Sequence, residues 1–226
     1  MIEKKVFEII NKSKKYGWVL EPDAKYILSE YNISLPSYKF AKNIDEAIKF
    51  VREIHYPIVC KVVSPEIIHK SDVGGVIVGI ENDEQLKIAF EKLSKLKGFL
   101  GVIVEKMVKG IELIVGAKND EQFGPVVLIG MGGVAVEIYK DTAIRMAPLS
   151  ERDINSMIAS LKCYPLLKGY RGAKGINIDS LVKMLEHFSK MIMDLKENFL
   201  SIDLNPVMCS ENECYVADAR IMLKNH

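Results

Sequence analysis

One stretch of the chain combines residue types that handle phosphate. It runs from Lys61 to Gly75 and reads Lys-Val-Val-Ser-Pro-Glu-Ile-Ile-His-Lys-Ser-Asp-Val-Gly-Gly. Lys61 is a mobile cation that can reach a polyphosphate, and Gly74 and Gly75 allow the backbone to turn its N–H groups toward a ligand. His69 is a neutral imidazole near physiological pH and can act as a nucleophile. The stretch predicts phosphate handling, although a single loop histidine is more often passive.

Polar residues near the end of the chain form a second candidate site. Ser201, Asp203 and Asn205 alternate with apolar residues, so they are expected to share one face of a strand. Asp218 is placed on the returning strand, where hairpin pairing would bring it close to Asn205. Carboxylate and amide oxygens suit Mg²⁺ held beside phosphates. The alternative is a set of ordinary strand-end residues, with Asn205-Pro206 acting as a turn.

The strand from Val102 to Val108 carries Glu105-Lys106 at the point where the chain is expected to pass from one lobe to the other. Backbone groups at a strand edge in a cleft between lobes can hydrogen-bond an adenine. Glu112 can accept hydrogen bonds from ribose hydroxyls. The alternative is an exposed strand-end pair and a solvated acid.

Arg145 lies inside an apolar stretch, Thr-Ala-Ile-Arg-Met-Ala-Pro. A charge in such a strand needs a partner. A guanidinium binds phosphate well through two parallel hydrogen bonds, but a structural pairing with Glu137 is equally consistent with the sequence. The glycine cluster Gly130, Gly132 and Gly133 is by itself more typical of a turn than of a phosphate site.

The elements around the lysine-to-glycine loop predict a small α+β lobe of residues 33–104. Strands are expected at Ile58–Val63 and Val76–Ile80, and capping-box spacings begin helices at Asn43 and Asn82. The resulting order of strand, helix, strand, strand, helix, strand is the split βαβ pattern.

Residues 1–32 and 105–226 are expected to form a larger lobe that begins with helices and is otherwise rich in strands. Its short apolar segments are separated by polar turns, which favours antiparallel pairing. The predicted strands are 111–117, 126–129, 134–138, 142–146, 200–204 and 215–221, and helices are expected to start at Ser150 and Asp179.

The composition is that of a soluble globular protein, with 49% apolar and 27% charged residues among 226. A net charge of +1 gives no electrostatic reason to expect nucleic acid or an acidic membrane as a partner. The start of the chain lacks the layout of a signal peptide, and no apolar run approaches the length of a membrane span. Cys60, Cys163, Cys209 and Cys214 are too scattered for a disulfide framework, so reduced thiols and a cytoplasmic location are expected.

Three sequence motifs, in this order, narrow the interpretation. They are Ser-Pro-Glu-Ile-Ile-His-Lys-Ser-Asp-Val-Gly-Gly-Val, Phe-Gly-Pro-Val-Val-Leu-Ile-Gly-Met-Gly-Gly and Ile-Asp-Leu-Asn-Pro-Val. Together they resemble the β subunit of ADP-forming (NDP-forming) acetyl-CoA synthetases, relatives of the succinyl-CoA synthetase β subunit. The resemblance runs from about Glu21 to Leu223. It implies an α+β ATP-grasp fold, with two lobes and a nucleotide cleft between them.

The resemblance also implies the reaction acyl-CoA + ADP + phosphate ⇌ acid + CoA + ATP, which passes through phosphohistidine. In that family a separate α subunit, or a fused domain, binds CoA and carries the main phosphorylated histidine. The β chain holds ATP or ADP with Mg²⁺. The resemblance also suggests an α₂β₂ assembly.

The roles of the family can be carried onto matching positions of this sequence. The implied nucleotide-binding residues are Lys61, Gly74, Gly75, Glu105, Lys106, Met107, Val108, Glu112 and Arg145, and the implied magnesium ligands are Asn205 and Asp218. The implied catalytic residues are His69, which would relay phosphate within the subunit, and Asp203, which would orient a phosphohistidine from the partner. Similar proteins more often carry an acid where Ser201 stands.

The sequence is also consistent with two other functions. A stand-alone ATP-grasp carboxylate ligase would join an acyl-phosphate to an amine or thiol, but no third, substrate-recognition domain is visible in the sequence. A non-catalytic subunit that senses nucleotide would bind ATP without transferring phosphate.

Overall fold

The computed structural model describes residues 4–133 and 141–224. The chain divides into two compact units, which we name the small unit (Pro36–Val108) and the large unit (Met1–Leu35 with Lys109–His226). The sequence places the corresponding boundaries at 33–104. The predicted strand 134–138, including Glu137, lies outside the described residues.

The small unit contains a four-stranded antiparallel sheet with the order β2-β5-β3-β4. Strand β5 lies between β2 and β3 and is antiparallel to both, which is the split βαβ arrangement that the sequence predicts. The strands are β2 (Tyr38–Ala41), β3 (Ile58–Val63), β4 (Val76–Ile80) and β5 (Gly101–Lys106).

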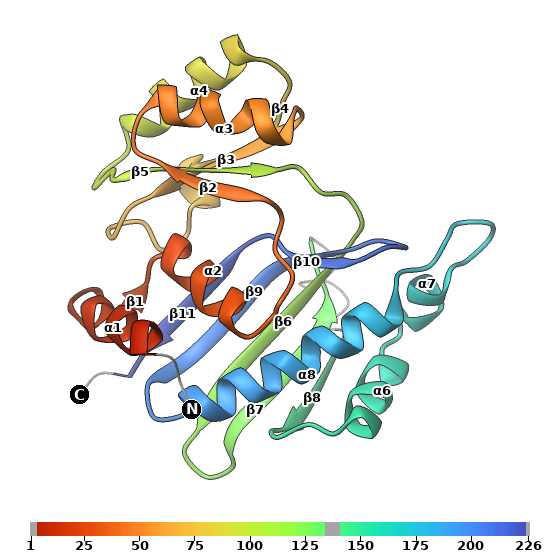
Figure 1. Ribbon diagram of the computed structural model, residues 1–226. Helices are drawn as coiled ribbons and strands as arrows, with labels where there is room; N and C mark the ends of the chain where they lie inside the picture. Colours follow the sequence, from red (N-terminus) through yellow and green to blue (C-terminus); the bar gives the residue numbers. More distant parts are fainter. Residues whose placement is uncertain (1–3, 134–140, 225–226) are drawn as a thin grey trace. The chain divides into compact units, whose positions relative to one another are not determined.

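Helices α3 (Ile44–Ile54) and α4 (Asp83–Ser94) cover one face of this sheet (Figure 1). Both start where the sequence predicts, because the side chains of Asn43 and Asn82 accept hydrogen bonds from the backbone N–H three residues later. Such a cap stabilises a helix by about 1 kcal/mol. The apolar faces of the two helices and of the sheet form one core, which includes Cys60, Val62, Leu86, Leu93 and Val104.

The large unit is built on an antiparallel sheet with the order β1-β11-β9-β6-β7-β8, and β10 also pairs with β9. Strand β9 is long because it pairs with three neighbours, β6, β10 and β11. The strands are β1 (Trp18–Val19), β6 (Ile111–Asp120), β7 (Gly124–Met131), β8 (Thr142–Met146), β9 (Phe199–Cys209), β10 (Cys214–Val216) and β11 (Ala219–Leu223).

Helices pack on one face of this sheet and form the larger core with it (Figure 1). The longest, α8, has a continuous apolar stripe that includes Leu185, Phe188 and Ile192. Ser150 and Asp153 form a capping box at the start of α6, as the sequence predicts. The helices are α1 (Lys4–Ser13), α2 (Glu21–Glu30), α6 (Glu151–Ser160), α7 (Tyr164–Lys168) and α8 (Ile178–Leu195), with short 3-10 turns η1 (Lys14–Tyr16) in this unit and η2 (Ser71–Val73) in the small unit.

All four cysteines are buried, and none of them forms a disulfide in the structure. Cys209 and Cys214 face each other directly across β9 and β10. Their mutual hydrogen bond, followed by burial, raises the pKa of Cys209 far above its ordinary value, so that thiol stays protonated. None of the described helices has the combination of length and apolar sequence that spanning a membrane requires.

Candidate functional site

Lys61 and Glu105 form a buried ion pair in the small unit. The lysine Nζ lies 2.6 Å from Oε1 of the glutamate, and the two side chains are only 5% and 3% exposed. Lys61 on β3 and Glu105 on β5 are diagonal neighbours on the same sheet face, because Lys61 pairs with Ile103 and Val59 pairs with Glu105. The sequence singles out both residues but does not predict that they pair. Lys61 is therefore a fixed rather than a mobile cation, and Glu105 is not an exposed strand-end acid.

Gly74 and Gly75 close the loop that follows β3. Gly74 has a φ of +65° at the end of η2, a conformation that favours glycine. At Gly75 an added Cβ would lie 2.7 Å from a Val62 methyl and 2.9 Å from the Lys70 oxygen. The N–H groups of both glycines donate within the loop, to Ser71 and Lys70 carbonyls at 3.2 and 2.7 Å. The expectation that these N–H groups point at a ligand is therefore wrong for this conformation.

His69 lies exposed within that loop, between two anchored positions. On one side, the buried side chain of Ile67 joins the core of the small unit. On the other, the carbonyl of the buried Lys70 accepts the hydrogen bond from Gly75. The loop thus presents the imidazole on the surface of the small unit while its flanks are held.

The predicted adenine hinge, residues 105–108, leaves the small sheet at the end of β5. Two of its N–H groups are already used: Lys106 donates to Ser37 and Met107 donates to Pro57. The Lys106 side chain donates to the His55 carbonyl at the end of α3, at 3.0 Å. For Val108 N–H, the described part of the chain supplies no backbone acceptor.

A polar pair lies on the face of the large sheet that points away from the helices. Arg220 on β11 pairs with Asp203 on β9, and their Nη2 and Oδ2 atoms are 2.5 Å apart. The two side chains are 23% and 43% exposed, so both can still meet a ligand. The register continues this row across the sheet through Gly116, Leu128 and Ile144.

Asn205 occupies a β-bulge. Leu204 pairs with Val115 and Val207 pairs with Leu113, so Asn205 and Pro206 together lie opposite one residue of β6. A proline inside a central strand cannot donate a ladder hydrogen bond, and the bulge accommodates it. Strand β9 therefore runs through Asn205-Pro206, and the alternative of a chain-reversing turn is wrong.

Asp218 lies in the short break between β10 and β11, rather than on a strand as the sequence predicts. Its carbonyl nevertheless accepts a hydrogen bond from the Asn205 N–H at 3.2 Å, so the predicted proximity of the two residues is confirmed. Asp203 is two residues from Asn205 on the same strand. The three predicted polar residues of the final hairpin thus come together.

The donor chemistry of this hairpin fits Mg²⁺. Asn205 and Asp218 offer an amide and a carboxylate oxygen, and Mg²⁺ typically takes one or two protein carboxylates together with substrate phosphates and water. Within residues 4–133 and 141–224, no group of three or more His, Cys, Asp or Glu side chains could hold a metal ion alone. A magnesium ion here would therefore depend on nucleotide phosphates and water for its remaining ligands.

Glu112 lies on the same face of β6 as Gly116, because the residues between them alternate regularly against β7. Gly132 approaches it closely: its N–H donates to the Glu112 carbonyl at 2.7 Å, and an added Cβ would meet that carbonyl at 2.9 Å. A Cβ at Gly133 would lie 3.0 Å from the carboxylate. The glycine cluster therefore leaves room around Glu112, a role that the sequence does not reveal.

Arg145 lies on the opposite face of the large sheet from Asp203. It pairs with Val127, which is buried in the helix-side core, whereas Ile144 belongs to the row of Asp203 and Arg220. Its guanidinium is exposed and donates to the Ile144 carbonyl at 2.9 Å. Among the described strands, β8 is the last in the order of the large sheet, so the guanidinium is not enclosed there. Sequence reasoning missed Arg220, whose signal was a basic residue two positions after Asp218.

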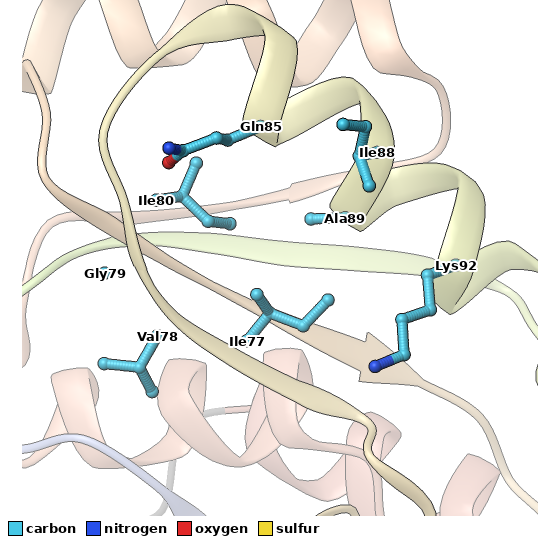
Figure 2. A pocket seen from close by; sticks show the side chains of 8 residues that line it. All are labelled: Ile77, Val78, Gly79, Ile80, Gln85, Ile88, Ala89 and Lys92. Carbon is cyan, nitrogen blue, oxygen red and sulfur yellow. The ribbon is translucent and has the colours of Figure 1, made fainter.

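A separate groove of about 330 Å³ lies between β4 and α4 in the small unit (Figure 2). Its walls are mostly apolar and include the exposed side chains of Val78 and Ile88. Lys92 lies at one end. None of its lining residues is among those that the sequence predicts for phosphate chemistry.

Residues 11–223 match the family described as ATP-grasp domain. Together with the two units and the face of the large sheet that carries Asp203 and Arg220, this match defines the class of protein. The chain belongs to the ATP-grasp domain family, as the sequence predicts.

Its relatives include several acetate–CoA ligases (ADP-forming). The chain is 43% identical over 228 residues to the β subunit of acetate–CoA ligase (ADP-forming) I from Pyrococcus furiosus, which covers 97% of this chain and 98% of the relative. The predicted resemblance to β subunits of ADP-forming acetyl-CoA synthetases is confirmed.

Two solved structures of acetyl-coenzyme A synthetase 1 from Ca. Korarchaeum cryptofilum are also similar. One, in complex with coenzyme A and Ca-AMPCP, has a TM-score of 0.89 and 38% identity and covers 96% of this chain and 99% of that chain. The other contains coenzyme A and Mg-AMPPCP, with its phosphohistidine segment pointing towards the nucleotide binding site. Its TM-score is 0.85 at 38% identity, covering 97% of this chain and 100% of that one.

Proposed function

We propose that the chain is the nucleotide-binding β subunit of an ADP-forming acyl-CoA synthetase and that it transfers phosphate between a phosphohistidine and ADP. The observation that carries the proposal is the Asp203–Arg220 pair on the face of the large sheet away from the helices. Asn205 lies two residues further along β9, and a backbone hydrogen bond links it to Asp218. The acids, amide and guanidinium of these residues are the groups that phosphoryl transfer requires. Similarity over nearly the full length of a β subunit supports it.

Asn205 and Asp218 are the residues that would hold Mg²⁺ beside the nucleotide. The bound ion would offset phosphate charge during transfer. Lys61, Glu112 and the Val108 N–H are proposed to bind the phosphate, ribose and base of the nucleotide. Arg220, rather than Arg145, is proposed to bind the transferring phosphate, because a guanidinium binds phosphate oxygens through two parallel hydrogen bonds.

Asp203 is proposed to orient the phosphohistidine. Its carboxylate would accept the ring N–H and so fix which nitrogen carries the phosphoryl group. The histidine would come from a CoA-binding α subunit, and an α₂β₂ complex in the cytoplasm is the assembly that we expect. His69 is proposed to relay phosphate within the β subunit, since it lies exposed on an anchored loop.

The relay can be tested in the reconstituted complex. We expect His69→Ala to lower ATP formation from acyl-CoA, ADP and phosphate by more than about a hundredfold, because it removes the nucleophile itself. His187→Ala is the matched control, since that imidazole lies on α8 and contacts the Asn32 carbonyl. A His69→Ala complex that turns over like the wild type would contradict the relay.

The same assay separates the alternatives. ATP consumption by the isolated chain with a carboxylic acid and an amine would favour a stand-alone ligase. Nucleotide binding without any phosphoryl transfer in the complex would favour a sensing subunit. Our proposal requires transfer that depends on the partner.

A further inference from the structure

Lys25 on α2 is fully buried, which is unusual for a lysine. Its side chain is 0% exposed, and Nζ lies 3.8 Å from Oε1 of Glu21, itself 3% exposed, one helical turn earlier. Lysine and glutamate are almost never fully buried unless they are paired. Replacing a buried ion pair by apolar residues is often neutral or stabilising. The burial of this pair is therefore weak evidence for a contribution to stability alone.

The Lys25 ammonium is directed at the break in the final hairpin. Nζ donates to the Ala217 carbonyl at 2.9 Å, across 192 positions of sequence. Helix α2 packs against β11, the strand that begins just after this break (Figure 1). The hydrogen bond thus ends on the peptide that joins Ala217 to Asp218.

The break is also held by backbone hydrogen bonds on both sides. Val216 N–H donates to Ser34 at 3.0 Å, and Ala217 N–H donates to Pro206 at 3.0 Å. The Asp218 carbonyl accepts from Asn205 at 3.2 Å. Main-chain hydrogen bonds therefore link Asn205 to Asp218. The Lys25 side chain, from a distant helix, adds one more hydrogen bond to this set at the Ala217 carbonyl.

We propose that Lys25 is a positioning residue for the Asn205–Asp218 site: it fixes the Ala217 peptide and thereby sets the direction in which Asp218 meets a magnesium–nucleotide complex. The inference rests on the proposed function. A charged donor suits this task because its hydrogen bond is stronger than that of a neutral donor. Outer groups that orient metal ligands typically change metal affinity about tenfold to a hundredfold when removed.

The test uses the full chain with both charges neutralised, Glu21→Gln with Lys25→Met. Changing both residues avoids leaving one buried charge without its partner. The matched control is Lys12→Met with Asp23→Asn, a pair at 3.7 Å that involves the same helix but has a mostly exposed lysine. Lys25→Arg, which retains a charged donor, is measured alongside.

Two readouts are compared. Amide hydrogen exchange reports on the break itself, in the segment from Cys214 to Ala219. Calorimetry reports how much Mg²⁺ tightens ADP binding relative to ADP in EDTA. We expect the double variant to unfold in one cooperative transition like the wild type. Its amides should exchange faster than those of the wild type in this segment but not in β7. The tightening of ADP binding by Mg²⁺ should become about tenfold smaller.

The control pair should match the wild type in both readouts, and Lys25→Arg should keep most of the Mg²⁺ effect. Unchanged exchange in the 214–219 segment, or an unchanged Mg²⁺ effect, in a folded double variant would overturn the positioning role. If the double variant does not fold, Lys25→Arg alone decides. A folded Lys25→Arg chain that exchanges faster than the wild type in the 214–219 segment and has lost the Mg²⁺ effect would overturn the positioning role as well. A wild-type chain that does not bind ADP with Mg²⁺ would instead contradict the proposed function, and the exchange measurement would still decide the role of Lys25.

Discussion

At the scale of single residues, charge pairs decide which groups can face a ligand. Asp203 and Arg220 are partly exposed and pair across two strands, whereas Lys61 and Glu105 are almost fully enclosed. Exposed ion pairs contribute about 0–1 kcal/mol to folding. Breaking an enclosed pair by removing one member costs several times more. The two pairs should therefore respond differently to substitution.

Arg220→Met should lower the rate of ATP formation by about a hundredfold, a typical cost of removing one preorganised donor from a transferring group. Arg145→Met should leave the rate within about threefold, because its guanidinium lies on the helix side of an edge strand. The measurement is the steady-state rate of ATP formation by the reconstituted complex with each variant. Equal losses for the two variants would contradict the assignment.

Lys61→Met should destabilise the chain by about 3–5 kcal/mol, because Glu105 loses its cationic partner in an enclosed position. The double variant Lys61→Met with Glu105→Gln should regain most of the lost folding stability. It should still bind ADP poorly. Urea unfolding measures the first effect and calorimetry the second. Lys39→Met, exposed on β2 of the same sheet, is the control. A Lys61→Met chain as stable as the wild type would be the contrary result.

Some site residues could be identified from sequence and others could not. Alternation predicts that Asp203 and Asn205 lie near each other, and a hairpin predicts Asp218 beside them. The face of the sheet on which Arg145 lies could not be predicted, because its strand is apolar at neighbouring positions and alternation does not say which face is buried. Arg220 was missed because pairing between distant strands is needed to place it against Asp203.

At the scale of elements, one carboxylate joins β8 to the helices. Asp141, just before β8, accepts hydrogen bonds from the N–H groups of Lys162 and Cys163, both at 2.7 Å, in the segment between α6 and α7. Burial tends to raise the pKa of this carboxyl, but the two N–H donors outweigh it and lower the pKa. The connection between helices is therefore held by a charge.

Because the pKa of Asp141 is lower in the folded state than in the unfolded state, its contribution to stability is present above the unfolded pKa and is lost as pH falls through the folded pKa. Asp141→Asn should cost about 2–3 kcal/mol at pH 7. The difference from the wild type should shrink below about pH 4. Urea unfolding at pH 7, 5 and 3 measures it. A difference that grows on acidification would contradict this account.

Elements with strong local signals could be predicted from sequence. Strands β3, β4 and β8 begin and end where the sequence places them, and the asparagine caps mark α3 and α4. The two-residue β1 and the five-residue α7 were missed because they are too short to show a period. Strand β9 extends beyond its predicted end because a bulge, which no local pattern announces, accommodates Pro206.

At the scale of the whole molecule, the two units have separate hydrophobic cores, and the predicted site residues are divided between them. The small unit contributes Lys61, His69 and the 105–108 segment, whereas Glu112, Asp203 and the final hairpin belong to the large unit. The residues with proposed roles are therefore distributed over both units.

The most direct test of this account is phosphoryl transfer itself. A CoA-binding α subunit, phosphorylated on its histidine with labelled phosphate and freed of small molecules, is mixed with this chain, ADP and Mg²⁺. The account predicts that label moves to ATP within the mixing experiment, and that Asp218→Asn slows the transfer while the exposed Asp45→Asn does not. Label that stays on the α subunit in the presence of the wild-type chain would contradict it.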